Sequence, residues 1–195
     1  MKHYKLVVSL GLLLLAAALF MALGNVYDEF RAGRKAQNIS NSLETVRAET
    51  MTAEDPASEA AEEIPTLQLD GDLYIGTIEI PSIDLTLPVY SEWDYDKLKN
   101  APCRYSGSVG GNNLIIMAHD YKSHFGPIKE LPLGEQIAFV DVDGSTFLYE
   151  VNMIQQLDAE DIAAMEQGDW DLTLFTCSRD GHARCTLRCM RTQPD

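Results

Sequence analysis

A cysteine and an arginine near the C-terminus are spaced so that a β-hairpin would bring them together. Between them lies Asp180-Gly181, a dipeptide typical of two-residue type I′ turns, whose central residues both need a positive φ. Counting outward from that turn places Cys177 directly opposite Arg184, with Cβ atoms roughly 5 Å apart. A thiolate is a strong nucleophile, and an adjacent cation favours it over the thiol. The spacing therefore predicts a nucleophilic cysteine, although a surface hairpin with an incidental cysteine also fits the pair taken alone.

Side-chain alternation along the two strands decides which residues would share a face with this cysteine. That face contains Thr173, Phe175, Cys177, Arg184, Thr186 and Arg188. The opposite face is mostly apolar and contains Leu172, Leu174, Thr176, Cys185, Leu187 and Cys189. We therefore expect the apolar face to turn toward the core, and Phe175, Thr186 and Arg188 to be candidate substrate contacts beside the nucleophile.

A histidine that ends an apolar segment is the candidate partner for the thiol. Residues 114–118 form a continuous apolar run that predicts a buried strand, and His119 follows it directly. An imidazole titrates near neutral pH, which suits it to accept and return a proton during acyl transfer. A structural or surface histidine is the alternative interpretation of His119. The competing candidate is His124, which lies in the following loop and would line the site or face solvent.

The remaining cysteines predict no disulfide framework, because the chain has only four cysteines in 195 residues. Cys185 and Cys189 would lie on one strand face, about 13 Å apart at ~3.3 Å per residue, which is too far for a bridge. Cys103 could pair with one of them, although buried free thiols are the simpler expectation. No paired Cys-x-x-Cys pattern indicates zinc, and Asp141 and Asp143 fit a solvated turn better than calcium, so neither metal nor cofactor is expected.

The elements that must position these residues are mostly short strands. Strands are expected at residues 73–80, 84–90, 114–118, 136–142 and 146–154, ahead of the hairpin that carries Cys177. Pro88 predicts a sheet edge or a bulge in the second of them. Short helices are expected at residues 93–99, 125–131 and 158–165, the last of them capped by Asp158. The pattern predicts an all-β fold with short helices, either a barrel or a sandwich.

An uncharged, almost wholly apolar run from Leu6 to Leu23 follows the short basic N-terminus. As a helix it would span about 27 Å, close to the hydrocarbon thickness of a bilayer. This length favours an uncleaved signal-anchor, and a cleaved signal peptide is the alternative. With either, the rest of the chain is expected to be extracytoplasmic.

The segment between the apolar run and the strands has the composition of a stalk. We divide the chain into a membrane segment (1–27), an acidic extracytoplasmic stalk (28–66) and a folded domain (67–195). The helical spacing of Ile39, Leu43 and Val46 predicts a short amphipathic helix in the stalk, and residues 54–63 predict an acidic spacer. The formal net charge of −15 argues against nucleic-acid binding, which needs a basic surface.

Three motifs follow one another in the folded domain. The first is IGTIEIP at 75–81 followed by LPVY at 87–90, and the second is GNNLIIMAH at 111–119 with FGP at 125–127. The third is TLFTC at 173–177, followed by an arginine. Together they resemble the sortase family, the membrane-anchored cysteine transpeptidases of Gram-positive bacteria, over about residues 67–191. The resemblance implies a closed β-barrel of about eight strands behind an N-terminal transmembrane helix.

The same resemblance implies a role for each candidate site residue. Cys177 matches the nucleophile, His119 matches the general acid/base, and Arg184 matches the arginine that stabilises the oxyanion or the substrate. The implied reaction is cleavage of a C-terminal sorting signal, of the Leu-Pro-x-Thr-Gly kind, through a thioacyl-enzyme. An amine of a cell-wall precursor then resolves that intermediate. The alternatives are a membrane-tethered peptide-binding domain without turnover and a cysteine peptidase with water as the acceptor.

Two departures from the family pattern bear on the site. The family usually has Gly before the histidine and often Arg or Asn after it, whereas this chain has Ala118 and Asp120. A carboxylate beside the imidazole could favour the imidazolium, but adjacent strand residues point apart, so a small effect is expected.

The resemblance also implies the partners of the chain. They are surface proteins with a sorting signal, a cell-wall amine and the membrane, which one N-terminal helix would cross.

Overall fold

Eight strands close into a barrel, and Cys177 and Arg184 lie at one end of it. The computed structural model describes residues 2–50, 64–178 and 180–192. Within these ranges the strands are β1 (Leu67–Leu69), β2 (Asp72–Ile80), β3 (Leu85–Tyr90), β4 (Cys103–Ser106), β5 (Leu114–Met117), β6 (Gln136–Asp141), β7 (Thr146–Asp158), β8 (Leu172–Cys177) and β9 (Ala183–Arg191). The helices are α1 (Lys2–Thr50), α2 (Tyr95–Leu98) and α3 (Ile162–Glu166), with short 3-10 helices at Pro81–Ile83 and Pro127–Glu130.

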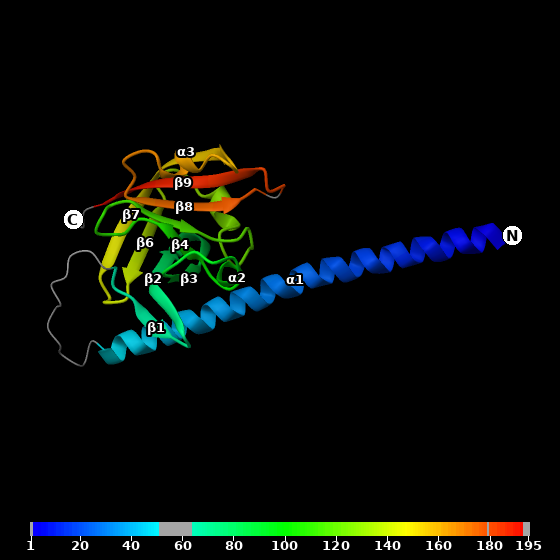
Figure 1. Ribbon diagram of the computed structural model, residues 1–195, viewed down its shortest axis with the longest axis horizontal. Coiled ribbons are helices and arrows are strands. Elements are labelled where there is room, and N and C mark those ends of the chain that lie inside the picture. The colour runs from blue at the N-terminus through cyan, green and yellow to red at the C-terminus, as the bar shows by residue number, and fades with distance from the viewer. Residues whose placement is uncertain (1, 51–63, 179, 193–195) are drawn as a thin grey trace.

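The strand order closes the sheet on itself. It runs β2-β3-β4-β5-β8-β9-β7-β6, and β6 pairs back to β2, while β1 only extends one end of β2. The β3–β4 and β5–β8 pairs are parallel, and the other pairs are antiparallel. The weakest point of the closed sheet is the β3–β4 pairing, which consists of Tyr90 and Cys103 alone. The predicted all-β fold and barrel of about eight strands are therefore confirmed (Figure 1).

The β8–β9 hairpin separates two buried layers. As predicted, its apolar face turns inward, and it contributes Leu172, Leu174, Cys185, Leu187 and Cys189 to the main core. The outward face is not open to solvent, because Phe175 packs with Ile115 of β5 and Met165 of α3 in a second, smaller cluster. Helix α3 therefore covers part of the barrel's outer surface next to the candidate site.

Two local predictions differ from the structure. Strand β7 continues to Asp158, because residues 155–158 pair with residues 183–186 of β9. Helix α3 consequently begins later than predicted, and Asp161, rather than the predicted Asp158, caps it by accepting a hydrogen bond from the Ala164 amide at 3.0 Å.

Pro88 was predicted to mark a sheet edge or a bulge. It lies in β3, which pairs with β4 only at Tyr90, so no residue of β4 needs the backbone N–H that proline lacks.

Helix α1 runs without a break through the predicted membrane segment and most of the predicted stalk. Its second half lies along β3, with Ala32, Ala36, Ser40 and Leu43 buried at helical spacing. The predicted amphipathic helix of the stalk is thus present, but it packs on the barrel. The predicted acidic spacer at residues 54–63 lies outside the described residues.

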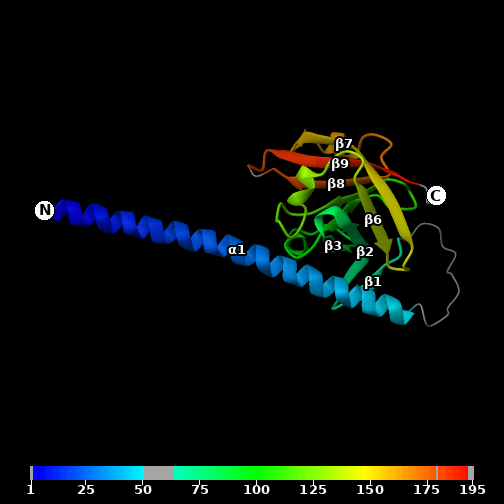
Figure 2. The ribbon, with the colours of Figure 1, turned by 180° about the vertical axis from the view of Figure 1, so that it is seen from behind.

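The first half of α1 projects away from the barrel (Figures 1 and 2). The segment Val7–Ala48 is long and apolar enough to cross a membrane, with a mean hydropathy of 2.5 in its most apolar window, and none of that window is buried. This part of α1 is therefore a candidate membrane span. In Figure 1 the β8–β9 turn points to the same side of the barrel as the projecting half of α1.

Candidate active site

Cys177 ends β8 opposite Arg184 of β9, and His119 follows the end of the neighbouring strand β5. Strands β5 and β8 run parallel with Met117 opposite Phe175, and just beyond β5 the Ala118 amide donates to the Phe175 carbonyl at 3.2 Å. His119 lies two residues beyond Met117, and Cys177 lies two residues beyond Phe175, so both follow this pair toward the same end of the barrel. On the other side of β8, Cys177 is paired directly with Arg184 of β9. The fold thus brings the three residues together at one end of the barrel.

The predicted register of the hairpin is confirmed, but the predicted two-residue turn is wrong. The Ser178 amide donates to the Ala183 carbonyl at 2.8 Å, and the Gly181 amide donates to the Ser178 carbonyl at 3.0 Å. The connection between Ser178 and Ala183 is therefore longer than two residues, and Gly181 within it has a φ of +77°. A wider turn keeps the same register. Because Ser178 and Ala183 form the hydrogen-bonded pair, Cys177 and Arg184 form a non-hydrogen-bonded pair, in which side chains come closer.

The His119 imidazole is held by aromatic rings. The ring of Tyr121 lies 4.9 Å from it at 30°, and the ring of Tyr95 lies 6.4 Å away at 83°. Its Nε2 atom is buried and has no hydrogen-bond partner among the described residues. Burial lowers the pKa of His119, and the charge of Lys99 lowers it further. The imidazole is therefore mostly neutral near pH 7 and able to accept a proton.

The competing histidine lies in the core. His124 was expected to line the site or face solvent, but it is fully buried. Burial, followed by the nearby His119, lowers its pKa to about 4. Neither ring nitrogen makes a hydrogen bond of normal geometry with the described residues, and only the Asn100 backbone partly offsets the burial. The physical reason is the tight loop after β5, which turns this side chain inward beside Phe125.

The unusual carboxylate after the histidine is engaged elsewhere. Asp120 forms an ion pair with Lys129, with 2.6 Å between the carboxylate oxygen and Nζ. It is not among the groups that shift the pKa of His119. The small effect expected from the sequence agrees with this arrangement.

Arg184 sits at the hairpin turn with its side chain half-buried. Its Nη1 donates to the carbonyl of Gly181 at 3.2 Å and to that of Ala183 at 3.3 Å. No other hydrogen bond joins this guanidinium to the described residues, so further N–H donors of its fork are available to a substrate.

A cavity of about 390 Å³ opens next to Arg184. Its walls are largely apolar and come from Trp93, Tyr105, Met117, Ile162, Met165 and Phe175, with Asp158 and Asp161 among the lining residues. Phe175 is only 3% exposed, and its ring packs edge-on against Tyr105 at 5.4 Å. Of the three expected substrate contacts, Phe175 is therefore the one that lines the cavity.

Thr186 and Arg188 do not line the cavity, because both are buried and Arg188 is held against α3. Thr186 is fully buried, and its hydroxyl donates to the Arg184 carbonyl at 3.4 Å. Arg188 is 1% exposed and donates to the carbonyls of Met165 and Ala164 at 2.7 and 2.6 Å, and to the Thr173 hydroxyl at 2.9 Å. Arg188 thus ties α3, one wall of the cavity, to the barrel.

Replacing Arg188 by leucine is expected to destabilise the domain by about 2–4 kcal/mol, because it removes three hydrogen bonds from buried acceptors. Denaturant unfolding of the full chain in detergent measures this, with Arg191→Leu as the control at an exposed position of the same strand. A loss for Arg188→Leu no larger than that of the control would contradict the supporting role.

Among the four cysteines, burial leaves Cys177 as the reactive candidate. All four are free thiols, and Cys103, Cys185 and Cys189 are buried. Burial raises the pKa of Cys103 to about 11, that of Cys189 to about 12, and that of Cys185 above its usual value. Cys177 alone is partly exposed.

We expect iodoacetamide to label Cys177 at least about tenfold faster than the other three, because alkylation requires an accessible thiolate. Peptide mapping by mass spectrometry during a time course measures the four rates, and a denatured sample gives the rates without protection. Labelling of Cys185 or Cys189 at the rate of Cys177 would contradict the assignment.

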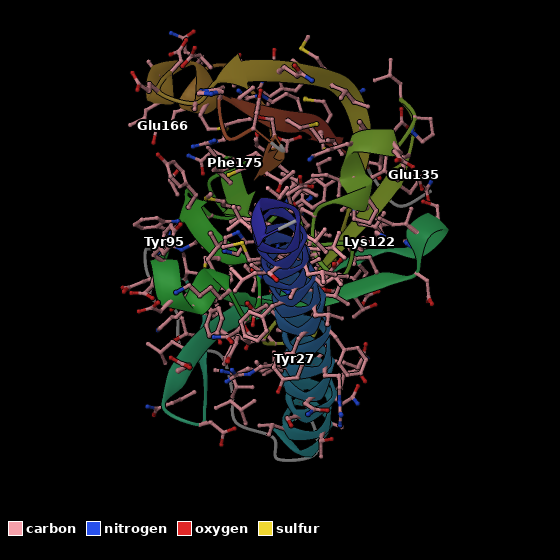
Figure 3. All side chains as sticks on the ribbon, turned by 90° about the vertical axis from the view of Figure 1, so that its right-hand side faces the viewer. Tyr27, Tyr95, Lys122, Glu135, Glu166 and Phe175 are labelled. Carbon is pink, nitrogen blue, oxygen red and sulfur yellow. The ribbon has the colours of Figure 1, made fainter. Side chains whose placement is uncertain are left out.

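Sequence reasoning missed the residues that frame the site. Tyr95 and Tyr121 flank His119, and Trp93 and Tyr105 form cavity walls, yet each lies in a loop or a very short element without periodicity. Figure 3, which views this end of the barrel, shows Phe175, Tyr95 and Lys122 arranged around α1. The available signal was the proximity in sequence of Tyr121 to His119.

Comparison with known proteins adds independent findings. A family model described as the Sortase domain matches residues 78–191. Sortase A of Listeria monocytogenes serovar 1/2a (strain ATCC BAA-679 / EGD-e) is 27% identical over 116 residues, which cover 56% of this chain and 52% of that protein. The chain thus spans about half the length of this curated relative.

Solved structures resemble the fold. Sortase C from Clostridium perfringens SM101 is 25% identical with a TM-score of 0.56, over 83% of this chain and 91% of that chain. A Clostridium perfringens Sortase D5 transpeptidase is 21% identical with a TM-score of 0.59, over 82% of this chain and 97% of that chain, which supports the fold alone.

Proposed function

Because the chain belongs to the sortase family, whose domain matches residues 78–191, we propose that it is a cysteine transpeptidase acting through Cys177. Sortases as a family are cysteine transpeptidases. The observation that carries the proposal is the cross-strand pair of Cys177 on β8 and Arg184 on β9, with His119 just beyond the same end of the neighbouring strand β5. A domain that only binds peptides has no need of a partly exposed thiol opposite a guanidinium and near a histidine at the same strand ends.

The substrate that we propose is a protein with a C-terminal sorting signal of the Leu-Pro-x-Thr-Gly kind, cut at its Thr-Gly bond. One solved relative, a Clostridium perfringens sortase C of 25% identity and TM-score 0.55, was studied with a C-terminal cell wall sorting motif. The largely apolar cavity beside Arg184 would accept the apolar residues of such a signal.

The first half-reaction forms a thioester. Neutral His119 takes the thiol proton of Cys177 as sulfur attacks the threonine carbonyl carbon, and a tetrahedral oxyanion forms. The C–N bond then breaks, and the imidazolium gives its proton to the departing glycine amine. Arg184 keeps its proton, so its free N–H groups stabilise the oxyanion or hold the substrate backbone.

The second half-reaction transfers the acyl group to an amine of a cell-wall precursor. His119 accepts a proton from the incoming amine, the new C–N bond forms, and the C–S bond of the thioester breaks. The sulfur leaves as a thiolate and is reprotonated by His119, which returns the site to its starting state.

We further propose that the first half of α1 is a single membrane span and that the barrel is extracytoplasmic. The support is the exposed apolar segment of α1, which is a candidate span. Sorting-signal proteins and cell-wall precursors would both be available at that outer membrane face.

The experiment uses the full chain in detergent, a library of sorting-type peptides, hydroxylamine as the amine, and mass spectrometry. We expect a hydroxamate product that disappears in Cys177→Ala and in His119→Ala. Cleavage without hydroxamate would instead indicate a peptidase with water as acceptor. A folded chain that binds peptides without any product would indicate a binding domain and overturn the proposal.

A further inference from the structure

Helix α1 contacts the loop that follows His119, at Lys122 and Ser123. The amide of Lys122 donates to Oε1 of Glu29 at 2.6 Å, and the hydroxyl of Ser123 donates to the Glu29 carbonyl at 3.3 Å. One turn further along α1, a Cβ on Gly33 would lie only 2.8 Å from Cβ of Ser123. The absence of a side chain at Gly33 therefore permits the close approach of helix and loop.

Hydrogen bonds within this loop hold its residues together, so we expect a displacement of its α1-facing side to move the whole loop. The Tyr121 carbonyl accepts hydrogen bonds from the amides of His124 and Gly126 at 3.0 and 2.9 Å. The His119 carbonyl accepts one from the Phe125 amide at 3.1 Å. Phe125 is fully buried in the core, which leaves the segment at Tyr121 to Ser123 as the side that meets α1.

The ring of His119 takes its orientation from this loop. With no hydrogen-bond partner at Nε2 among the described residues, its orientation depends on packing against Tyr121 and Tyr95. Tyr121 is itself close to α1, since the carboxylates of Asp28 and Glu29 help to raise the pKa of its phenol after burial. The chain of contacts is therefore α1, the loop, the Tyr121 ring and the His119 ring.

We propose that Glu29 and Gly33 are positioning residues, through which the membrane-proximal part of α1 holds His119 in its working orientation. This inference rests on the proposed function of His119. Leu23 ends the apolar run, and Glu29 follows about 9 Å later along the same helix. A displacement of the barrel relative to the membrane segment would thus reach the imidazole through a few contacts. These are the hydrogen bonds of Glu29 to the loop and the packing of the Tyr121 ring on His119.

The test uses the full chain in nanodiscs and a Glu29 series. Gln at position 29 keeps the acceptor for the Lys122 amide, whereas Ala removes it, and Gly33→Leu pushes helix and loop apart. Glu44→Gln is the control, because Glu44 is exposed on the same helix away from the loop. We expect Glu29→Ala and Gly33→Leu to lower kcat by about 3–10-fold at unchanged KM, Glu29→Gln to retain most of it, and the control to be unaffected.

A second readout needs no substrate. Titration of the His119 ring by NMR, assigned with a His119→Asn variant, reports its environment, which includes Tyr95, Lys99, Tyr121 and His124. Burial lowers the pKa of this histidine, so a loosened loop that admits water should raise it. We expect the acid limb of kcat/KM and the NMR titration to move to higher pH together in Glu29→Ala.

Tyr121→Leu should move both readouts in the same direction, because it removes the ring contact with His119 while the groups that bond Glu29 to Lys122 and Ser123 remain. Unchanged kcat and an unchanged His119 titration in Glu29→Ala and Gly33→Leu, with folded barrels, would overturn the inference. A wild-type chain without turnover would refute the proposed function instead, and the NMR arm would still decide whether α1 positions the ring.

Discussion

Replacing Cys177 by alanine is expected to abolish thioacyl formation and amine transfer, by at least about 10⁴-fold, while the barrel stays folded. In the proposed reaction the cysteine supplies the bond that holds the acyl group between the two half-reactions, so its loss removes the intermediate itself. Serine should fail nearly as completely, because a hydroxyl is a much weaker acid than a thiol and the neutral imidazole of His119 would have to ionise it.

The measurement is hydroxamate formation with the best peptide from the library, alongside a thermal melt of each variant. Cys185→Ala is the matched control, since Cys185 neighbours Arg184 but faces the inside of the barrel. We expect that control to remain active. Substantial transfer by Cys177→Ala, or a loss in Cys185→Ala equal to it, would exclude Cys177 as the acyl carrier.

Replacing Arg184 by lysine is expected to lower kcat by about 10²–10³-fold, the cost typical of losing one donor to a developing oxyanion. Lysine keeps the positive charge. It cannot reproduce a planar fork that bonds the carbonyls of Gly181 and Ala183 with one arm and offers further N–H groups to substrate. The loss should therefore come from geometry rather than from charge.

Single-turnover kinetics with the same peptide separates thioester formation from transfer in this variant. Arg191→Lys is the matched control. Arg191 lies at the other end of the same strand from Arg184, where its guanidinium stacks on the Phe147 ring. Near-normal turnover by a folded Arg184→Lys chain would remove Arg184 from the proposed mechanism.

The pairing of Cys177 with Arg184 could be anticipated from the sequence because strand geometry is periodic. A turn signal and a side-chain period of two were enough to pair Cys177 with Arg184 and to turn Leu174 and Leu187 inward. The apolar run before His119 predicted the strand that carries it. These inferences depend only on residues close together in the sequence, and the strands of the barrel keep the same turn position and alternation.

Packing over the outer face could not be anticipated in the same way. Alternation placed Thr186 and Arg188 on the face of Cys177, but it gave no sign that α3 would cover them and use Arg188 as its anchor. Nor did the loop after β5 show that His124 would turn into the core. Contacts between elements distant in the chain decide these positions, and no local pattern encodes them.

The docking of α1 is the clearest case of such long-range packing. Its apolar positions predicted a short helix, but the barrel surface that receives them belongs to β3. The contact between Glu29 and the loop at Lys122 joins residues far apart in sequence. It makes part of the predicted stalk (28–66) a structural neighbour of the site.

The most direct measurement is peptide mapping of the acyl-enzyme. The full chain in detergent is mixed with a sorting-type peptide without added amine, quenched in acid within the first turnover, and digested. We expect the peptide containing Cys177 to gain the mass of the substrate fragment up to threonine, as a thioester that hydroxylamine releases. An acylated residue other than Cys177, or product formation with no acyl-enzyme at any time, would contradict it.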